Sequence, residues 1–164
     1  MEKGVIQAFY GDGKGKTSAA LGQALRDFKE GSRVTIIQFL KGKEPGEFQI
    51  LEKLEPDVSI FHFDQSQVNY IELSLEERER EKQNIINGVN FAHKVIETGE
   101  SDIIVLDELL GLVDLGILSN QDLIDLLQIQ GDYKRMYITG TNLDQSLVPY
   151  LDEICKISQE KDRT

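Results

Sequence analysis

The stretch with the clearest chemistry is residues 10–20, which read YGDGKGKTSAA. Alternating glycines let successive backbone N–H groups converge on phosphate oxygens, and a helix that starts there adds the positive end of its dipole. Lys16 adds a full positive charge, and Thr17 offers a hydroxyl group that can ligate Mg²⁺. The sequence therefore predicts a phosphate-binding loop. Its predicted members are Gly11, Asp12, Gly13, Lys14, Gly15, Lys16, Thr17 and Ser18.

This loop departs from the general pattern G-x-x-x-x-G-K-[ST], because Tyr10 stands where that pattern has its first glycine. A glycine-rich turn that merely joins a strand to a helix is the simpler interpretation. Such a turn needs neither three alternating glycines nor the Gly-Lys-Thr ending. We therefore favour phosphate binding.

A second motif, IIVLDE at residues 103–108, ends an apolar segment in two carboxylates. The end of a strand is the usual position of a metal ligand in folds that carry a phosphate-binding loop. We expect Thr17, Asp107 and Glu108 to hold Mg²⁺ or Mn²⁺. Neighbouring side chains at a strand end point to opposite sides, so one carboxylate would bind the metal directly and the other through water. The sequence leaves open which does which.

Hydrophobic periodicity places these motifs between strands and helices that alternate along the chain. Expected strands are residues 4–10, 34–39, 58–63, 102–106, 135–139 and 154–157, and expected helices are residues 18–30, 74–98 and 119–128. This alternation predicts an α/β fold: a three-layer, P-loop NTPase-like (RecA-like) architecture with a mostly parallel sheet flanked by helices. We expect residues 1–164 to form a single nucleotide-binding domain.

Two polar segments near the long helix have different expected roles. Residues 64–73, DQSQVNYIEL, lack clear periodicity and are expected to form a surface loop near the carboxyl ends of the strands, where α/β sheets bind ligands. Residues 76–81, EERERE, open the long helix and are expected to be only a solvated face.

The composition limits the partners and the compartment. The chain has 164 residues and a formal net charge of −11, from 18 basic and 29 acidic residues. A field of that sign repels nucleic acid and anionic membrane surfaces, so we expect neither as a partner. The single Cys155 rules out an internal disulfide and a four-cysteine zinc site, and no apolar run reaches membrane-spanning length. We expect a reduced, cytoplasmic protein.

The residues alone do not choose the reaction. A phosphate-binding loop with Mg²⁺ most often serves phosphoryl transfer or hydrolysis, which needs a group that orients the nucleophile and usually an arginine. None of the six arginines lies in an arginine-rich segment like the lid of small nucleotide kinases. A thymidine-kinase-like protein typically has a cysteine-bound zinc, against which one cysteine argues. A small ATPase or kinase stays open at this point.

Four segments match one protein family in order and spacing over about residues 3–140. They are YGDGKGKTSAALGQAL at residues 10–25, IIQFLKG at 36–42, VLDEL at 105–109 and YITG at 137–140. Together they resemble the ATP:corrinoid adenosyltransferases of the cobalamin-synthesis type, in which the missing first glycine is normal. The resemblance implies that Co(I) of a reduced corrinoid attacks the 5′-carbon of ATP and that triphosphate leaves intact.

The resemblance also implies roles for individual residues. Lys16, Thr17 and Glu108 would be the catalytic residues, acting on the departing triphosphate, and no general base is needed. Lys41 would be a further phosphate donor or merely solvated. Tyr70 is the preferred candidate for a corrinoid contact that helps to displace the lower axial ligand of cobalt. Weaker candidates for that contact are Phe61, Phe63 and Val68.

The same resemblance favours a homodimer and allows a flavoprotein as the electron donor. Family members commonly read Thr-Gly-Arg after the fifth core strand and continue into a longer tail, whereas this chain reads Thr139-Gly140-Thr141-Asn142 and ends at Thr164. We expect this difference to leave the nucleotide clamp intact and to affect the corrinoid side. Two alternatives follow: a paralogue that binds ATP or corrinoid with weak or no catalysis, and a generic small P-loop ATPase or kinase.

Overall fold

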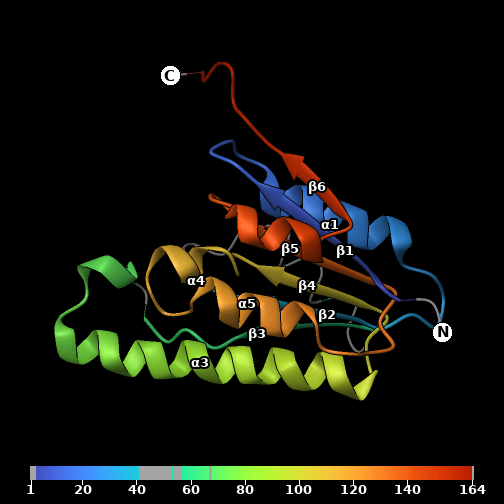
Figure 1. Ribbon diagram of the computed structural model, residues 1–164, viewed down its shortest axis with the longest axis horizontal. Helices are drawn as coiled ribbons and strands as arrows, with labels where there is room; N and C mark the ends of the chain where they lie inside the picture. Colours follow the sequence, from blue (N-terminus) through green and yellow to red (C-terminus); the bar gives the residue numbers. More distant parts are fainter. Residues whose placement is uncertain (1–2, 41–52, 54–56, 67, 164) are drawn as a thin grey trace.

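The computed structural model describes residues 3–40, 53, 57–66 and 68–163. Within them, six strands form one sheet in the order β3-β2-β4-β5-β1-β6, and every neighbouring pair is parallel (Figure 1). The strands are β1 Val5–Tyr10, β2 Val34–Gln38, β3 Val58–His62, β4 Ile103–Asp107, β5 Arg135–Gly140 and β6 Glu153–Lys156. Parallel strands place all their carboxyl ends at one edge of the sheet, which is where the predicted site residues lie.

Helices cover both faces of the sheet (Figure 1). They are α1 Lys16–Asp27, α3 Leu75–Thr98, α4 Gly111–Asp114 and α5 Asn120–Leu127, with 3₁₀ turns η2 Tyr70–Glu72 and η3 Gln145–Tyr150. One apolar cluster joins α1 to the sheet, and a larger cluster joins the opposite face to α3, α4 and α5. All residues of β2 and β4 are buried, as expected for strands covered on both faces. The predicted three-layer α/β fold is confirmed.

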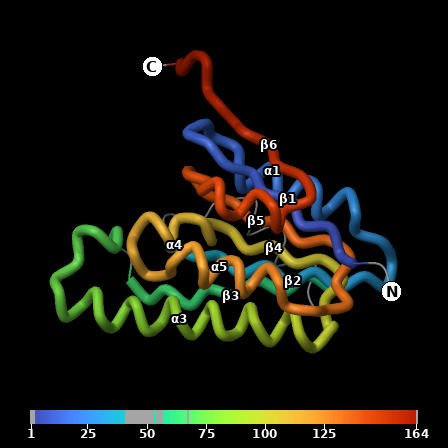
Figure 2. The backbone as a smooth tube through the Cα atoms, viewed as in Figure 1, coloured from blue at the N-terminus to red at the C-terminus, as the bar shows by residue number. Residues whose placement is uncertain are grey.

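The segment after β6 passes beside the loop that joins β1 to α1 before it projects from the sheet (Figure 2). Ile157 accepts a hydrogen bond from the Gly13 N–H at 2.9 Å and donates one to the Tyr10 carbonyl at 2.8 Å. The chain beyond the last strand is thereby tied to the glycine-rich loop.

Most of the expected elements form within a few residues of their predicted bounds. Helix α1 starts at Lys16 rather than at residue 18, so Lys16 and Thr17 belong to its first turn. The Ser74 hydroxyl caps α3 by accepting the Glu77 N–H, and Gly99 ends that helix with φ 69°. Within the described ranges, none of the helices combines the length and the hydrophobicity that crossing a bilayer requires.

The expectation that EERERE at 76–81 is only a solvated face is wrong at its last residue. Glu81 is 5% exposed, and it continues the stripe of α3 that faces the sheet and includes Ile85, Gly88 and Ala92. The spacing of these positions is that of one helix face, and an acidic residue at its end hid its burial from the sequence pattern.

Two Gly→Ala substitutions should change stability in opposite directions. At Gly140, at the end of β5, an added methyl group would overlap the Leu110 side chain, and overpacking of this kind costs about 1–3 kcal/mol. At Gly22, in α1, a methyl group meets no neighbouring atom, and the gain in helix propensity is about 0.5–1 kcal/mol. Urea unfolding of Gly140→Ala and Gly22→Ala measures both, and equal shifts would contradict the packing described here.

Candidate functional site

The glycine-rich loop has a backbone that only glycine adopts without strain at two positions. Gly11 has φ 127° and Gly15 has φ 98°, both in the region that L side chains rarely adopt. At Gly11 and Gly13 a side chain would also collide with the carbonyl group of Ile157. The first turn of α1 follows directly, with the Ala19 N–H donating to Gly15 O at 2.8 Å. The loop therefore leads into a helix N-terminus, the arrangement that suits an anion.

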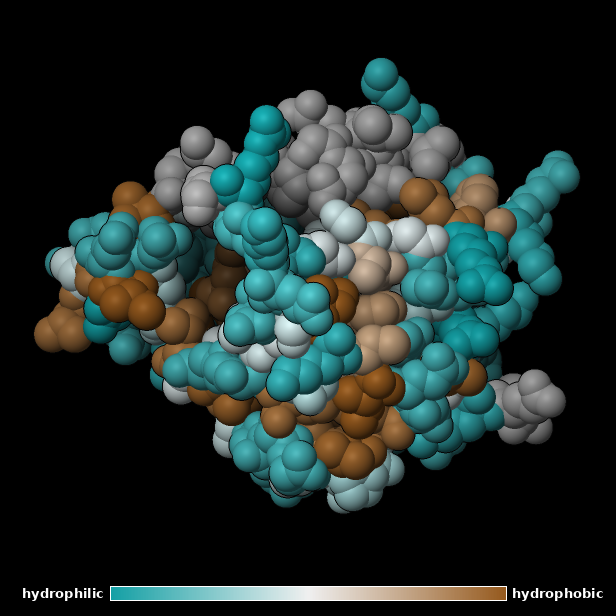
Figure 3. Space-filling view, turned by 90° about the horizontal axis from the view of Figure 1, so that it is seen from above, coloured by the Kyte–Doolittle hydropathy of each residue, from teal (hydrophilic) through white to brown (hydrophobic). Residues whose placement is uncertain are grey.

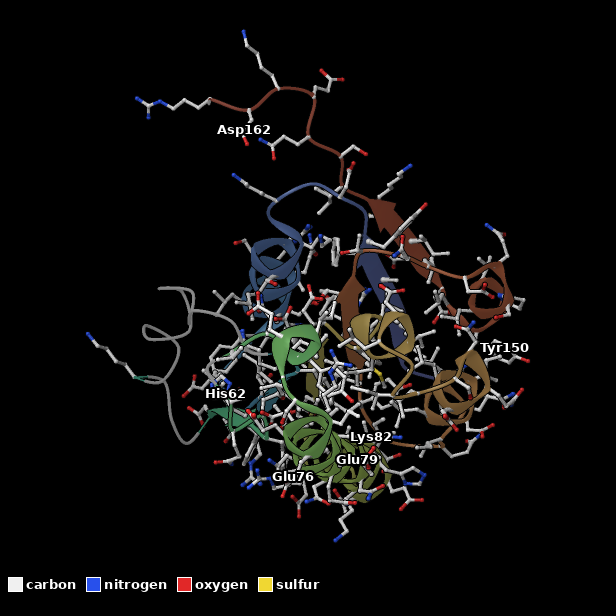
Figure 4. All side chains as sticks on the ribbon, turned by 90° about the vertical axis from the view of Figure 1, so that its left-hand side faces the viewer. His62, Glu76, Glu79, Lys82, Tyr150 and Asp162 are labelled. Carbon is white, nitrogen blue, oxygen red and sulfur yellow. The ribbon has the colours of Figure 1, made fainter. Side chains whose placement is uncertain are left out.

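The two lysines of the loop have different environments. Lys16 Nζ folds back over the loop and donates to the carbonyl oxygens of Gly11 at 2.7 Å and Gly13 at 3.2 Å. The Lys14 side chain is 79% exposed, and its Nζ lies 3.5 Å from the Asp162 carboxylate on the projecting terminal segment (Figure 4). Of these two lysines, only Lys16 places its ammonium group against the backbone of the loop.

A buried carboxylate connects the loop to the sheet. Asp107, the last residue of β4, is 2% exposed, and its Oδ1 accepts hydrogen bonds from Thr17 Oγ1 at 2.8 Å and Thr139 Oγ1 at 2.9 Å. Thr139 Oγ1 in turn accepts the Glu108 N–H at 2.8 Å. The structure thus brings together three of the predicted site residues, Thr17, Asp107 and Glu108, and adds Thr139.

Glu108 has an unusual backbone and an unusual carboxyl group. Its φ is 61°, a conformation that costs a residue other than glycine about 1–3 kcal/mol and that persists where surrounding contacts impose it. Burial raises the pKa of Glu108, the charges of Asp107 and Asp114 raise it further, and the charge of Lys16 lowers it. The carboxyl group therefore lies within the electrostatic reach of Lys16.

Gln38 is a polar residue of this site that the sequence reasoning missed. It is 5% exposed at the end of β2, in register with Asp107, and its Oε1 has no hydrogen-bond partner among the described residues. Such a buried acceptor is uncommon in a native structure and marks a position where water or a ligand group is expected. The signal in the sequence was a glutamine that closes an otherwise apolar strand.

The residues present fit Mg²⁺ or Mn²⁺. The Thr17 hydroxyl and the Asp107 carboxylate are oxygen donors within hydrogen-bond distance of each other, and Mg²⁺ is commonly bound by one or two protein oxygens together with phosphates and water. No cluster of three or more His, Cys, Asp or Glu side chains suited to a metal occurs in the described part of the chain. A site completed by phosphate oxygens does not require one.

A cavity of about 370 Å³ lies near Glu108. Its wall consists mainly of the segment after β3, and Figure 3 shows a hollow with apolar atoms between that segment and the rest of the molecule. Leu40 lines the cavity, and Leu40 Cδ1 and Glu108 Oε2 are the atoms nearest to the position of a side chain at Gly111. The apolar cavity and the polar site are therefore neighbours.

The structure separates the four predicted corrinoid contacts into two pairs. Tyr70 and Val68 line the cavity. Phe61 and Phe63 are not among its lining residues, and both pack against Phe91, with ring centroids 4.6 and 5.5 Å apart. Their first role is thus in packing. Lys41, the other predicted contact near this site, lies outside the described residues.

The fold and the site together define a P-loop NTPase-like α/β protein, and comparisons with known proteins specify the family. The family model described as ATP:corrinoid adenosyltransferase BtuR/CobO/CobP matches residues 2–164, and the chain belongs to this family. The corrinoid adenosyltransferase CobA of Salmonella typhimurium is 29% identical over 98% of this chain and 79% of its own length. Corrinoid adenosyltransferases of Escherichia coli K12 and Pseudomonas aeruginosa are 28% and 24% identical, over 79% and 77% of their lengths.

Thr139→Val tests the hydrogen bonds around Asp107. The substitution keeps the shape of a fully buried side chain but removes one donor to Asp107 and the acceptor of the Glu108 N–H. We expect a loss of about 1–3 kcal/mol in the free energy of unfolding and weaker binding of MgATP, measured by urea unfolding and titration calorimetry. Thr141→Val, at an exposed position two residues further on, is the matched control, and an equal loss in both variants would contradict this role.

Proposed function

We propose that this chain transfers the 5′-deoxyadenosyl group of ATP to the Co(I) centre of a corrinoid and releases triphosphate. The observation that carries the proposal is the family match over residues 2–164. The geometry agrees with it, because a phosphate-binding loop and an apolar cavity lie next to each other at the carboxyl edge of the sheet. ATP and the corrinoid are therefore substrates that meet at this edge.

In the proposed reaction the cobalt electron pair attacks C5′ of ATP, the Co–C bond forms, and the bond between C5′ and its oxygen breaks with its electrons. Triphosphate leaves with that oxygen. Because Co(I) is a strong nucleophile, no side chain has to remove a proton. The protein orients the two substrates, excludes water and stabilises the charge of the leaving group.

The glycine-rich loop is the proposed clamp for the leaving group. The N–H groups of Gly11 and Gly13 already donate to the carbonyl groups of Thr141 and Ile157. The other backbone N–H groups of the loop and the N-terminus of α1 would face the triphosphate, and Lys16 would turn from the loop carbonyls to the phosphate oxygens. Thr17 and Asp107 would hold Mg²⁺ or Mn²⁺, with Glu108 beside them. The metal ion would supply further neutralisation of triphosphate charge.

The corrinoid is proposed to enter the cavity lined by Val68 and Tyr70. An apolar wall on the lower face of the corrin ring would disfavour a polar lower ligand and make reduction to Co(I) easier. We further propose that the protein acts as a homodimer in the cytoplasm, with a flavoprotein as electron donor. The dimer and the electron donor follow from the family resemblance and the compartment from the composition, and sedimentation analysis tests the dimer.

An anaerobic incubation with MgATP and chemically reduced corrinoid tests the function. The proposal predicts a light-sensitive alkyl-cobalt spectrum and one triphosphate per adenosylated corrinoid. ATP that is bound but not consumed would instead indicate a binding paralogue. ADP and orthophosphate formed without corrinoid would indicate an ordinary ATPase.

Lys16→Ala should reduce the rate of adenosylation of Co(I) corrinoid by about 10²-fold or more, because it removes a preorganised charge at the leaving group. The measurement is the initial rate at saturating corrinoid over a range of MgATP concentrations. Lys29→Ala removes the same charge from an exposed position just after α1 and should leave the rate unchanged. Equal rates for the two variants would remove Lys16 from the clamp.

Tyr70→Ala should separate the two stages of the reaction. If the Tyr70 ring helps to displace the lower ligand, the variant will lose far more activity in a coupled assay that starts from base-on Co(II) corrinoid than in an assay that starts from preformed Co(I). The comparison needs both assays on the same preparation. Equal effects in both would show that Tyr70 has no part in lower-ligand displacement.

A further inference from the structure

Helix α3 carries a buried carboxylate that points to backbone rather than to a cation. Glu81 is 5% exposed, and its two oxygens accept the N–H groups of Gln65 at 2.7 Å and Ser66 at 2.6 Å. Asn84 donates to the same carboxylate at 3.3 Å. One side chain on the helix thereby binds two successive amides of a segment fifteen residues earlier in the chain.

Of these two amides, that of Ser66 belongs to a residue that lines the cavity, and Gln65 lies between the lining residues Asp64 and Ser66. Ser66 and Glu81 both line it, together with Tyr70 and Val68. The Ser66 hydroxyl also accepts the Val68 N–H at 3.0 Å and donates to the Val68 carbonyl at 3.2 Å. The Glu81 carboxylate therefore holds Ser66 in place, and Ser66 in turn holds the backbone of Val68.

A second side chain of the same helix fastens the other end of the segment. Arg78 Nε donates to the Tyr70 carbonyl at 3.2 Å, and the terminal nitrogen Nη2 donates to the Ile71 carbonyl. The guanidinium carbon lies 5.9 Å from the centre of the Tyr70 ring. Arg78 and Glu81 lie three residues apart on one side of α3. The outer turns of the helix thus hold a loop whose apolar residues Val68 and Ile71 are exposed.

Burial of a carboxylate costs free energy unless hydrogen-bond donors satisfy it, so the presence of a buried carboxylate at position 81 needs a reason. An apolar residue would serve the packing of α3 equally well, because positions 85, 88 and 92 of the same stripe are Ile, Gly and Ala. What an apolar residue cannot do is accept two loop amides. The carboxylate is therefore better explained by the loop that it holds than by the helix that carries it.

We propose that Glu81 is a positioning residue for the corrinoid: its carboxylate holds the backbone of Gln65 and Ser66, and thereby fixes the cavity wall against which the corrinoid binds. The proposal rests on the proposed function for the identity of the ligand. The hydrogen bonds between Glu81 and the loop do not depend on the proposed function, because they are contacts within the chain. Glu81 touches no reacting atom in this account.

Glu81→Gln is the main variant, because the amide keeps the size of the side chain but replaces one acceptor oxygen with an NH₂ group. Glu81→Ala removes both acceptors and serves if the glutamine variant is too mild. The matched control is Glu79→Gln, which makes the same charge change on the side of α3 that faces away from the sheet (Figure 4).

Three measurements on each protein test the proposal. Amide hydrogen exchange reports whether the N–H groups of Gln65 and Ser66 lose protection. Equilibrium dialysis with cobinamide, a corrinoid without a lower base, gives corrinoid affinity without any chemistry, and titration with MgATP gives nucleotide affinity in parallel. Loss of one charge-assisted hydrogen bond should weaken cobinamide binding about tenfold and leave MgATP binding unchanged.

The expected result is faster exchange of at least one of the two amides and weaker cobinamide binding in Glu81→Gln, with neither change in Glu79→Gln. Faster exchange with unchanged cobinamide affinity would overturn the positioning role, as would a parallel loss of cobinamide and MgATP affinity, which indicates general destabilisation. A failure of the proposed function would appear differently, as absence of cobinamide binding by the unmodified protein.

Discussion

One buried carboxylate, that of Asp107, joins the three parts on which the site depends. It ends the central strand β4, it is 2% exposed, and it accepts hydrogen bonds from the hydroxyl groups of Thr17 in α1 and Thr139 in β5. A buried anion needs such donors, and here one comes from helix α1 and the other from the neighbouring strand β5. Thr139 also holds the Glu108 N–H and with it the left-handed backbone of that residue. The loop, the two carboxylates and the strand ends are therefore set by one network.

The phosphate-binding loop, held in place by Asp107, suits the reaction of this family, in which such a loop binds the leaving group. In a kinase or ATPase the loop holds the phosphates while a nucleophile attacks phosphorus, and the fold must supply a group that orients it. In an adenosyltransferase the attacked atom is C5′, the nucleophile is the corrinoid itself, and the loop serves the leaving group. The neighbouring cavity, with Leu40 close to the Glu108 carboxylate, is where we propose that this second substrate binds.

The sequence predicted the layers of the fold and the location of the site, because alternating apolar segments and the Gly-Lys-Thr loop are local patterns. It did not predict which carboxylate faces Thr17, since that depends on β4 ending at Asp107 rather than one residue earlier. Gln38 was missed because a polar residue at the end of a strand suggests exposure, and Glu81 because it lies in the charged run EERERE. The burial of both depends on distant neighbours. The roles of the site residues and the single-domain organisation over residues 1–164 stay predictions.

The central claim is that the bond broken is the one between C5′ and oxygen, and isotope labelling tests it most directly. ATP carrying ¹⁸O at the oxygen that joins C5′ to the α-phosphorus would be turned over with Co(I) corrinoid, and the phosphate products would be analysed by mass spectrometry. We expect the triphosphate to carry the full label. Label retained on a nucleoside or nucleotide product would mean that a phosphorus–oxygen bond breaks, and it would contradict the account.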